Sequence, residues 1–296
     1  MADVLSKGTL FPEVLVTQLI NTVKGHSSLI ALSQQIPIAF NGNEIFTFSM
    51  DSDIDVVAEN GKKSHGGISL EPKKVNPIKV EYGARVSDEF MYASDEARIE
   101  ILRPFQEAFA KKLARGLDLM AMHGINPRTK AASTVIGDNH FDKAVTQTAK
   151  FDAADPDAII QTAVNMVQAG ERSVTGLALS PAFASALAAY KVNGVPQFPE
   201  FRWGSTPASA NGLAVSVNNT VSANSSTDRA IVGDFASMFK WGYAKQIPME
   251  IIPYGDPDNT GKDLKGYNQV YIRCEAYLGW AIMDGNSFVR ITEAGA

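Results

Sequence analysis

The longest amphipathic pattern in the chain covers residues 94–124. Apolar side chains recur there at three- and four-residue spacing, which predicts one long helix with a single buried stripe. The stripe consists of Leu102, Phe105, Phe109, Leu113, Leu117 and Met120. Ser94 is expected to cap this helix and Gly124 to end it. Pro104 cannot donate to the preceding turn, so a kink or a restart of the helix is expected there.

The remaining face of this predicted helix is polar. It carries Lys111, Lys112, Arg115 and Asp118. Residues of this kind on one face of an amphipathic helix usually lie in solvent. A solvated face, with Glu107 and Asp118 balancing the basic residues, is therefore one interpretation.

The first 85 residues predict two extensions without a core of their own. Residues 1–43 carry a short apolar helix that starts near Pro12 and a second apolar piece at 29–32. Residues 44–85 alternate apolar and polar positions and predict a long hairpin, with Pro72 and Pro77 confined to edge or bulge positions. An isolated two-stranded hairpin is marginal in water, so we expect it to pack on a neighbouring copy of the chain.

Residues 155–262 alternate helical and strand patterns and predict one α/β unit. Residues 237–243 and 248–254 are predicted as two of its strands. Residues 268–292 predict two further strands, joined near Asp284, which we expect to form the sheet along the long helix. The α/β unit would then be an insertion between the helix and its sheet.

Composition describes an ordered protein with a substantial core: 296 residues, 45% of them hydrophobic and 20% charged. A net charge of −5 argues against a dedicated nucleic-acid binder, which is normally basic. Cys274 is the single cysteine, which excludes an intrachain disulfide. There is no secretory signal at the start and no run of 18 apolar residues, so neither secretion nor a membrane span is expected.

The sequence lacks a recognisable catalytic or metal-binding motif. Residues 51–62 begin like a calcium loop but have Val56 at the glycine position and Lys62 at the glutamate position. Residues 255–262 miss the spacing of a phosphate loop, and Asp263 replaces its Ser/Thr. The four histidines are scattered singly and are expected to be surface or cap residues. We expect no enzyme, cofactor or metal, and an α/β enzyme is the weakest of the hypotheses.

The order of these parts, together with GTLFPE, AENGKK, AIVGDF and NQVYIRCEAYLGW, resembles the major capsid proteins of tailed bacteriophages, which have the Hong Kong 97 fold. The resemblance covers nearly the whole chain, although each motif alone is modest. It implies an α+β fold with a long spine helix and an inserted α/β axial domain. The implied parts are an N-arm at 1–43, an E-loop at 44–85, a peripheral domain at 86–154 and 263–296, and the axial domain at 155–262.

The resemblance implies a function as well. Subunits would assemble as hexamers and pentamers into an icosahedral shell around double-stranded DNA, in a virion built in the bacterial cytoplasm. A portal is an expected partner, and a decoration protein a further one. Because the hairpin begins within 50 residues of Met1, either a separate scaffolding protein is expected or the chain is numbered from a mature end that happens to be Met. The alternative is an encapsulin-type nanocompartment shell, which needs no DNA.

The resemblance also implies site residues. Asn60, Gly61, Lys62 and Lys63 at the hairpin tip would contact another subunit. Lys111, Lys112 and Arg115 would face DNA and bind its phosphates without sequence preference.

A covalent cross-link is a further hypothesis from the resemblance, in which Lys63 forms an isopeptide bond with Asn268, assisted by Glu275. A buried lysine loses its proton more easily, and a carboxylate can accept it. Against this, Lys63 sits in a polar turn typical of a solvated tip. Asn268 and Glu275 are seven residues apart, so on a flat strand they would face opposite sides.

Overall fold

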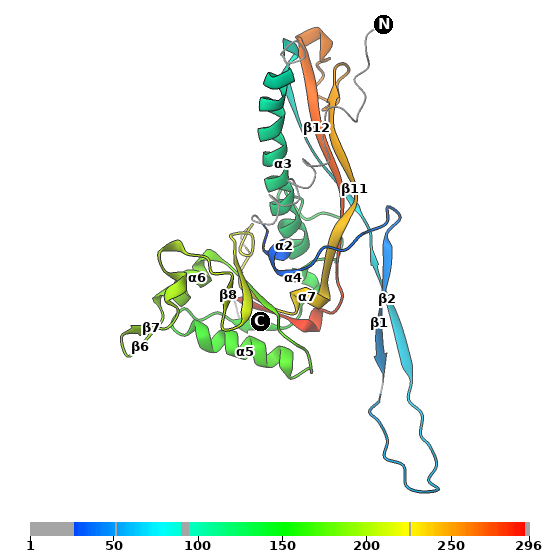
Figure 1. Cartoon of the computed structure of the whole chain (residues 1–296), viewed down its shortest axis with the longest axis vertical. Helices are drawn as coiled ribbons and strands as arrows, with labels where there is room; N and C mark the ends of the chain where they lie inside the picture. The colour runs from blue at the N-terminus through cyan, green and yellow to red at the C-terminus, as the bar shows by residue number, and fades with distance from the viewer. Residues whose placement is uncertain (1–26, 51, 90–94, 225, 294–296) are drawn as a thin grey trace.

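The computed structural model of the chain describes residues 27–50, 52–89, 95–224 and 226–293. A long helix lies along a narrow sheet, an α/β unit sits at one end of both, and a hairpin projects beside them (Figure 1). The predicted helix near Pro12 and the predicted cap Ser94 lie outside the described residues. Within the described part, no helix has both the length and the apolar character needed to cross a bilayer.

The long helix is α3, Asp95–His123. Five residues of the predicted stripe are buried and Phe105 packs against them, so the helical periodicity is confirmed. Gly124 follows in the left-handed conformation, with φ +65°, as expected for the end of a helix. The helix continues through Pro104, so the expected restart is wrong. The missing N–H removes one hydrogen bond, whereas Leu102 and Phe105 on either side remain held by the core.

The sheet beside α3 contains three antiparallel strands in the order β11-β12-β3: Phe239–Ile252, Gln269–Ile282 and Ile78–Ser87. The central strand, β12, lies along α3 as expected from the closing strands (Figure 1). Alternate residues of β12 share the core with the helix: Val270, Ile272, Cys274, Ala276, Leu278 and Trp280. The residues between them, including Arg273 and Glu275, therefore point to the other face of the sheet.

The α/β unit is built on a six-stranded sheet in the order β4-β13-β10-β5-β9-β8. These strands are Thr148–Lys150, Phe288–Thr292, Asp228–Gly233, Gly176–Leu179, Leu213–Val217 and Ser209–Ala210. Pairs β13–β4 and β5–β9 are parallel, and the others are antiparallel. Helices α5, Pro156–Gln168, and α6, Pro181–Ala189, pack on the sheet through a second apolar cluster. Asp155 and Ser180 cap these helices, each of which begins with proline as predicted.

Two strand assignments made from the sequence are wrong. Residues 239–252 form one strand, β11, in the sheet of α3 rather than two strands of the α/β unit. Conversely, β13 leaves the sheet of α3 and pairs with β10 and β4. Alternation identifies a strand, but the partner of a strand depends on contacts distant in sequence.

The described residues also form several short elements. They are α2 Ser28–Leu32, α4 Phe141–Ala144, α7 Phe235–Met238, the strands β6 Lys191–Val192 and β7 Val195–Pro196, and the 3₁₀ turns η2 Pro199–Gly204, η3 Lys265–Tyr267 and η4 Gly285–Ser287. Helix α2 is buried in the core with α3, so this part of the predicted arm packs within its own chain. The chain then crosses β11 and β12 where Gly242 opposes Gly279, and a Cβ at Gly242 would lie 1.9 Å from the carbonyl oxygen of Ile36.

Candidate functional site

The projecting hairpin consists of β1, Asn43–Met50, and β2, Ile68–Val75. Its register places Phe46 opposite Pro72, Phe48 opposite Leu70, and Met50 opposite Ile68. Directly opposed residues of an antiparallel pair lie on one face, so these six side chains form a continuous apolar face. We call it the hairpin face. Phe48 is 56% exposed and Met50 70%. The other side of the hairpin is largely polar, with Thr47 opposite Glu71 and Ile45 opposite Lys73.

The hairpin tip carries the four residues predicted to contact another subunit. Asn60, Gly61, Lys62 and Lys63 are all exposed. Asn60 adopts the left-handed conformation, and the Gly61 N–H donates to the Ala58 carbonyl at 2.8 Å, which makes a tight turn. The tip therefore lies in solvent in the single chain, and its contact with a second subunit stays a prediction.

The three residues of the cross-link hypothesis are not brought together within one chain. Asn268 is exposed in the left-handed conformation just before β12, whereas Glu275 is buried in the middle of that strand. Seven residues of strand separate them by roughly 20 Å. The Glu275 carboxylate lies 2.8 Å from Lys79 Nζ and 3.3 Å from Arg273 Nε, so two cations already flank it. Lys63 is at the hairpin tip.

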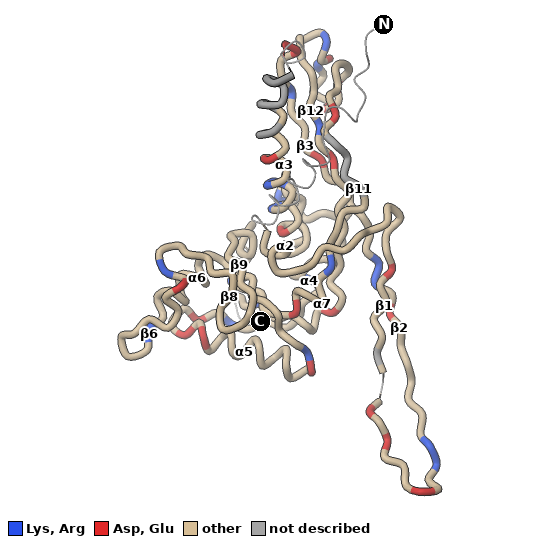
Figure 2. The backbone as a smooth tube through the Cα atoms, viewed as in Figure 1, with Lys and Arg blue, Asp and Glu red and all other residues tan. Residues whose placement is uncertain are grey.

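The structure does bring together Lys111, Lys112 and Arg115. They line a cavity of about 920 Å³ between α3, α6 and the loop around η2, which we call the basic groove. Figure 2 shows basic residues gathered on the half of α3 nearest the α/β unit. The Arg115 guanidinium donates from Nη1 to Asn219 Oδ1 at 2.6 Å, which holds the arginine against the loop that follows β9. The sequence predicts all three on the polar face of this helix, and their predicted contact with DNA stays a proposal.

Trp203 lines the same groove and was not predicted. Its side chain is 97% exposed, whereas Trp241 and Trp280 are buried. Its backbone has φ +63°, a conformation that large L-residues rarely adopt. Phe201, two residues earlier, is buried and packs edge-to-face on Phe198, so the loop is anchored and the tryptophan is turned outward.

Asp118 corrects the prediction of a solvated helix face. Its carboxylate is fully buried and accepts hydrogen bonds from the backbone N–H groups of Ser28 at 2.9 Å and Leu29 at 3.2 Å. It also accepts from the hydroxyls of Ser27 and of Thr220, the latter at 2.6 Å. Burial raises the pKa of the Asp118 carboxyl, and the four donors oppose part of that shift. Asp118 thus joins α2, α3 and the loop before β10.

A second buried cluster lies where α3 meets the six-stranded sheet. His123 Nδ1 is 2.9 Å from Asp142, and Nε2 is 2.8 Å from the Thr220 carbonyl, so the expectation of a surface or cap histidine is wrong here. Arg290 donates to both carboxylate oxygens of Asp228, at 2.9 and 3.0 Å, and contacts Asp142 at 3.1 Å. His123, Asp142 and Asp228 are close enough for a metal site, but Arg290 already supplies the cation between the aspartates.

The pKa values of two groups in this cluster differ from their usual values. Burial raises the pKa of Asp228 to about 6, against the effect of Arg290. Burial is the largest single influence on His123 and lowers its pKa, but the hydrogen bond and charge of Asp142, the Thr220 carbonyl and the charge of Asp228 together raise this pKa above its usual value. Protons are thus held more tightly by these two groups in the folded chain than in the unfolded one.

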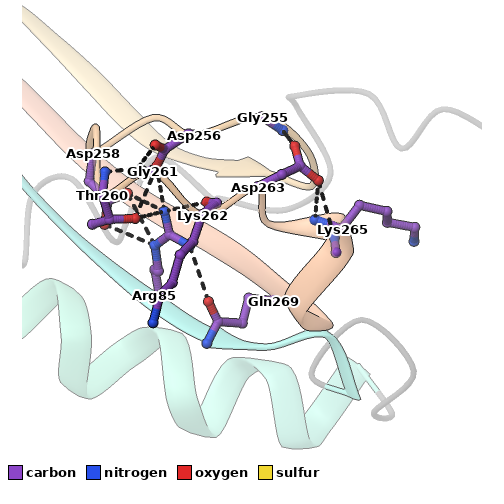
Figure 3. A network of polar contacts seen from close by, with 11 residues as sticks. Arg85, Gly255, Asp256, Asp258, Thr260, Gly261, Lys262, Asp263, Lys265 and Gln269 are labelled. Carbon is purple, nitrogen blue, oxygen red and sulfur yellow. Dashed lines mark hydrogen bonds and ion pairs between the residues drawn. The ribbon is translucent and has the colours of Figure 1, made fainter.

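Arg85 organises the loop at the far end of the sheet, where the sequence resembled a phosphate loop. Its Nη2 donates to Asp256 Oδ1 at 2.6 Å, to Thr260 Oγ1 at 2.6 Å and to the Lys262 carbonyl at 2.9 Å (Figure 3). Its Nε donates to both oxygens of Asp258. The loop thus directs these acceptors at an arginine of its own chain.

Comparison with known proteins gives the family. A family profile described as the phage capsid family matches residues 7–292, which is nearly the entire chain. The chain belongs to the phage capsid family. The capsid protein is therefore a structural component of a virion shell. No curated protein matches its sequence.

Solved structures agree over the whole fold. One from Mycobacterium phage Ogopogo has 29% identity and a TM-score of 0.78, with 91% of this chain and 92% of that chain covered. One from Gordonia phage Cozz has 25% identity and a TM-score of 0.77, covering 92% and 87%. The capsid of an empty GTA particle shares the fold at 12% identity, with a TM-score of 0.65 and coverage of 91% and 90%.

Proposed function

We propose that the capsid protein assembles as hexamers and pentamers into an icosahedral shell that encloses double-stranded DNA. The hairpin face carries this proposal. Six apolar side chains project from the body of the subunit on a two-stranded sheet, and such a sheet is marginal by itself. Covering the hairpin face on a second subunit would supply the missing burial.

We propose that the contact joins two different surfaces, the hairpin face of one subunit and another surface of its neighbour. The hairpin projects from the body of the subunit (Figure 1), so it can reach a neighbouring copy. Such heterologous contacts close into rings when the rotation between subunits closes. Rings of six and five copies of one subunit are the units of an icosahedral lattice. The bacterial cytoplasm is the proposed place of assembly, with a portal, a separate scaffolding protein and a decoration protein as proposed partners.

The test compares the two sides of the hairpin. Phe48→Ser removes a ring from the centre of the hairpin face, and Lys73→Ser is the matched control on the opposite side. Electron microscopy should show closed particles for the unchanged protein and for Lys73→Ser, and unassembled subunits for Phe48→Ser. Removing a buried aromatic ring from each of many equivalent contacts costs about 3 kcal/mol per contact, enough to prevent closure.

Two results would contradict the proposal. Particles of normal shape from Phe48→Ser would show that the hairpin face is not the contact. Particles purified from the source without nuclease-protected DNA would remove the proposed content and favour a compartment that encloses something else.

A further inference from the structure

The basic groove concentrates positive charge in a protein that is acidic overall. Of the residues that line it, three are cationic, Lys111, Lys112 and Arg115, and none carries a carboxylate. The chain as a whole has a net charge of −5. Lys130 lies near the same group: burial and then repulsion by Arg115 and Lys112 lower its pKa. Concentrated positive charge in an acidic protein favours an anionic ligand at this place.

Charge alone does not account for Trp203. An indole that is 97% exposed buries almost none of its apolar surface, and its left-handed backbone is a conformation that large L-residues rarely adopt. Gly204 follows, also left-handed, and nothing lies within 4 Å of where its Cβ would be. The loop thus presents a flat aromatic surface beside three cations, and the cavity has the volume of a small-ligand site.

We propose that the basic groove binds single-stranded nucleic acid, with a base stacked on Trp203 and the flanking phosphates held by Lys111, Lys112 and Arg115. Cations that follow a backbone, combined with an aromatic platform, are the features that bind unpaired strands. In a duplex the base faces are covered by their neighbours, so an exposed indole has nothing to stack on. An acidic peptide would use the cations but would leave the indole without a partner.

This inference rests on the proposed function only in bringing nucleic acid to the protein. It concerns unpaired stretches, whereas the proposed shell content is duplex. The two can fail separately, because oligonucleotide binding tests the groove and electron microscopy of particles tests the shell. A groove that binds no oligonucleotide leaves particle formation unaffected.

The tryptophans provide a direct assay. Since Trp241 and Trp280 are buried, quenching by an added oligonucleotide reports mainly on Trp203. The full chain, freed of nucleic acid, is titrated with a twelve-residue oligothymidylate, with a duplex of equal length and with polyglutamate. The variants are Trp203→Leu and Lys112→Ala, and Lys191→Ala is the control, because Lys191 is an exposed lysine on β6 that does not line the groove.

We expect oligothymidylate to quench the emission and to bind more tightly than the duplex. Trp203→Leu, measured by anisotropy of a labelled oligonucleotide, should weaken binding about tenfold. The logarithm of the binding constant should fall with the logarithm of salt concentration with a slope of about −2 for three phosphate contacts, and Lys112→Ala should reduce that slope by about 0.7. Lys191→Ala should bind normally.

Three outcomes would overturn the inference. Equal binding of duplex and single strand, unchanged in Trp203→Leu, would reduce the groove to a phosphate contact. Equal binding of polyglutamate would indicate an acidic protein partner. Loss of Trp203 exposure on assembly without nucleic acid would assign the indole to a contact between subunits.

Discussion

Replacing Asp118 tests whether one buried carboxylate holds α2 to the rest of the subunit. In Asp118→Ala, the four donors on Ser27, Ser28, Leu29 and Thr220 lose their acceptor. The two hydroxyls can rotate toward other acceptors. The two backbone N–H groups cannot, because the first turn of α2 offers them no carbonyl. Asp118→Ala therefore leaves at least two buried donors unsatisfied.

The expected loss follows from that count. An unsatisfied buried donor costs about 1–3 kcal/mol, and removing the buried charge returns part of the total, so we expect a loss of about 3–5 kcal/mol. This is a large share of a typical unfolding free energy of about 5–15 kcal/mol. Asp118→Asn keeps one acceptor oxygen but turns an NH₂ group toward a donor, so its loss should be smaller, about 2 kcal/mol.

Two measurements check the expectation on unassembled subunits. Urea unfolding gives the loss of stability, with Asp138→Ala as the control at an exposed aspartate. Hydrogen exchange gives the local effect: the amides of Ser28 and Leu29 should exchange at least tenfold faster, while those of β12 should change only with global stability. A loss below about 1 kcal/mol in Asp118→Ala, equal to that of the control, would refute the argument.

Two further predictions follow from the buried charges and from the hairpin tip. Because folding raises the pKa of Asp228 to about 6 and that of His123 above its usual value, both groups take up protons on folding. Their stabilisation is present below the unfolded pKa values and is lost as the pH rises through the folded ones. The contribution of these two groups to stability, measured by urea unfolding, should therefore fall from pH 5.5 to 8.5. The fall should be smaller in His123→Gln and unchanged in His65→Gln, whose histidine is exposed on the hairpin, and equal falls in both would contradict this reasoning. Separately, boiled particles should run at monomer mass, since Glu275 is held by cations; a ladder of higher bands that disappears in Lys63→Arg would instead establish cross-linking.

Periodicity in the sequence predicted most elements but not all their partners. Helix α3, the hairpin and the helices opened by Pro156 and Pro181 follow from local spacing and caps, which a sequence displays directly. Local spacing does not predict that β11 lies in the sheet of α3 and β13 in the six-stranded sheet. Both strands are apolar and bordered by turns, and their register depends on residues many positions away.

Some of the site residues could likewise be predicted from local spacing, and others could not. Lys111 and Lys112 precede Arg115 by four and three residues on one helix, so both lie near it and their grouping was predictable. Asp118 lies on the same predicted face, yet it is buried because α2 folds back over it from ninety residues earlier. Trp203 gave no local signal, since its exposure depends on the anchoring of the whole loop by Phe201.

The connections between the sheets suggest which parts of the subunit can move. The chain passes from β10 to β11 and returns from β12 to β13, and these crossings are bonded to each other: the Met283 N–H donates to the Met238 carbonyl at 2.8 Å, and the Asp234 N–H to the Ser287 carbonyl at 3.1 Å. Asp118 adds a third tie between the helix and the α/β unit. The hairpin is held mainly at its base, where Val75 is buried and β2 contacts β12, and most of its other residues are exposed. Hydrogen bonds therefore fix the helix, its sheet and the α/β unit to one another, whereas the hairpin is held to them mainly at its base.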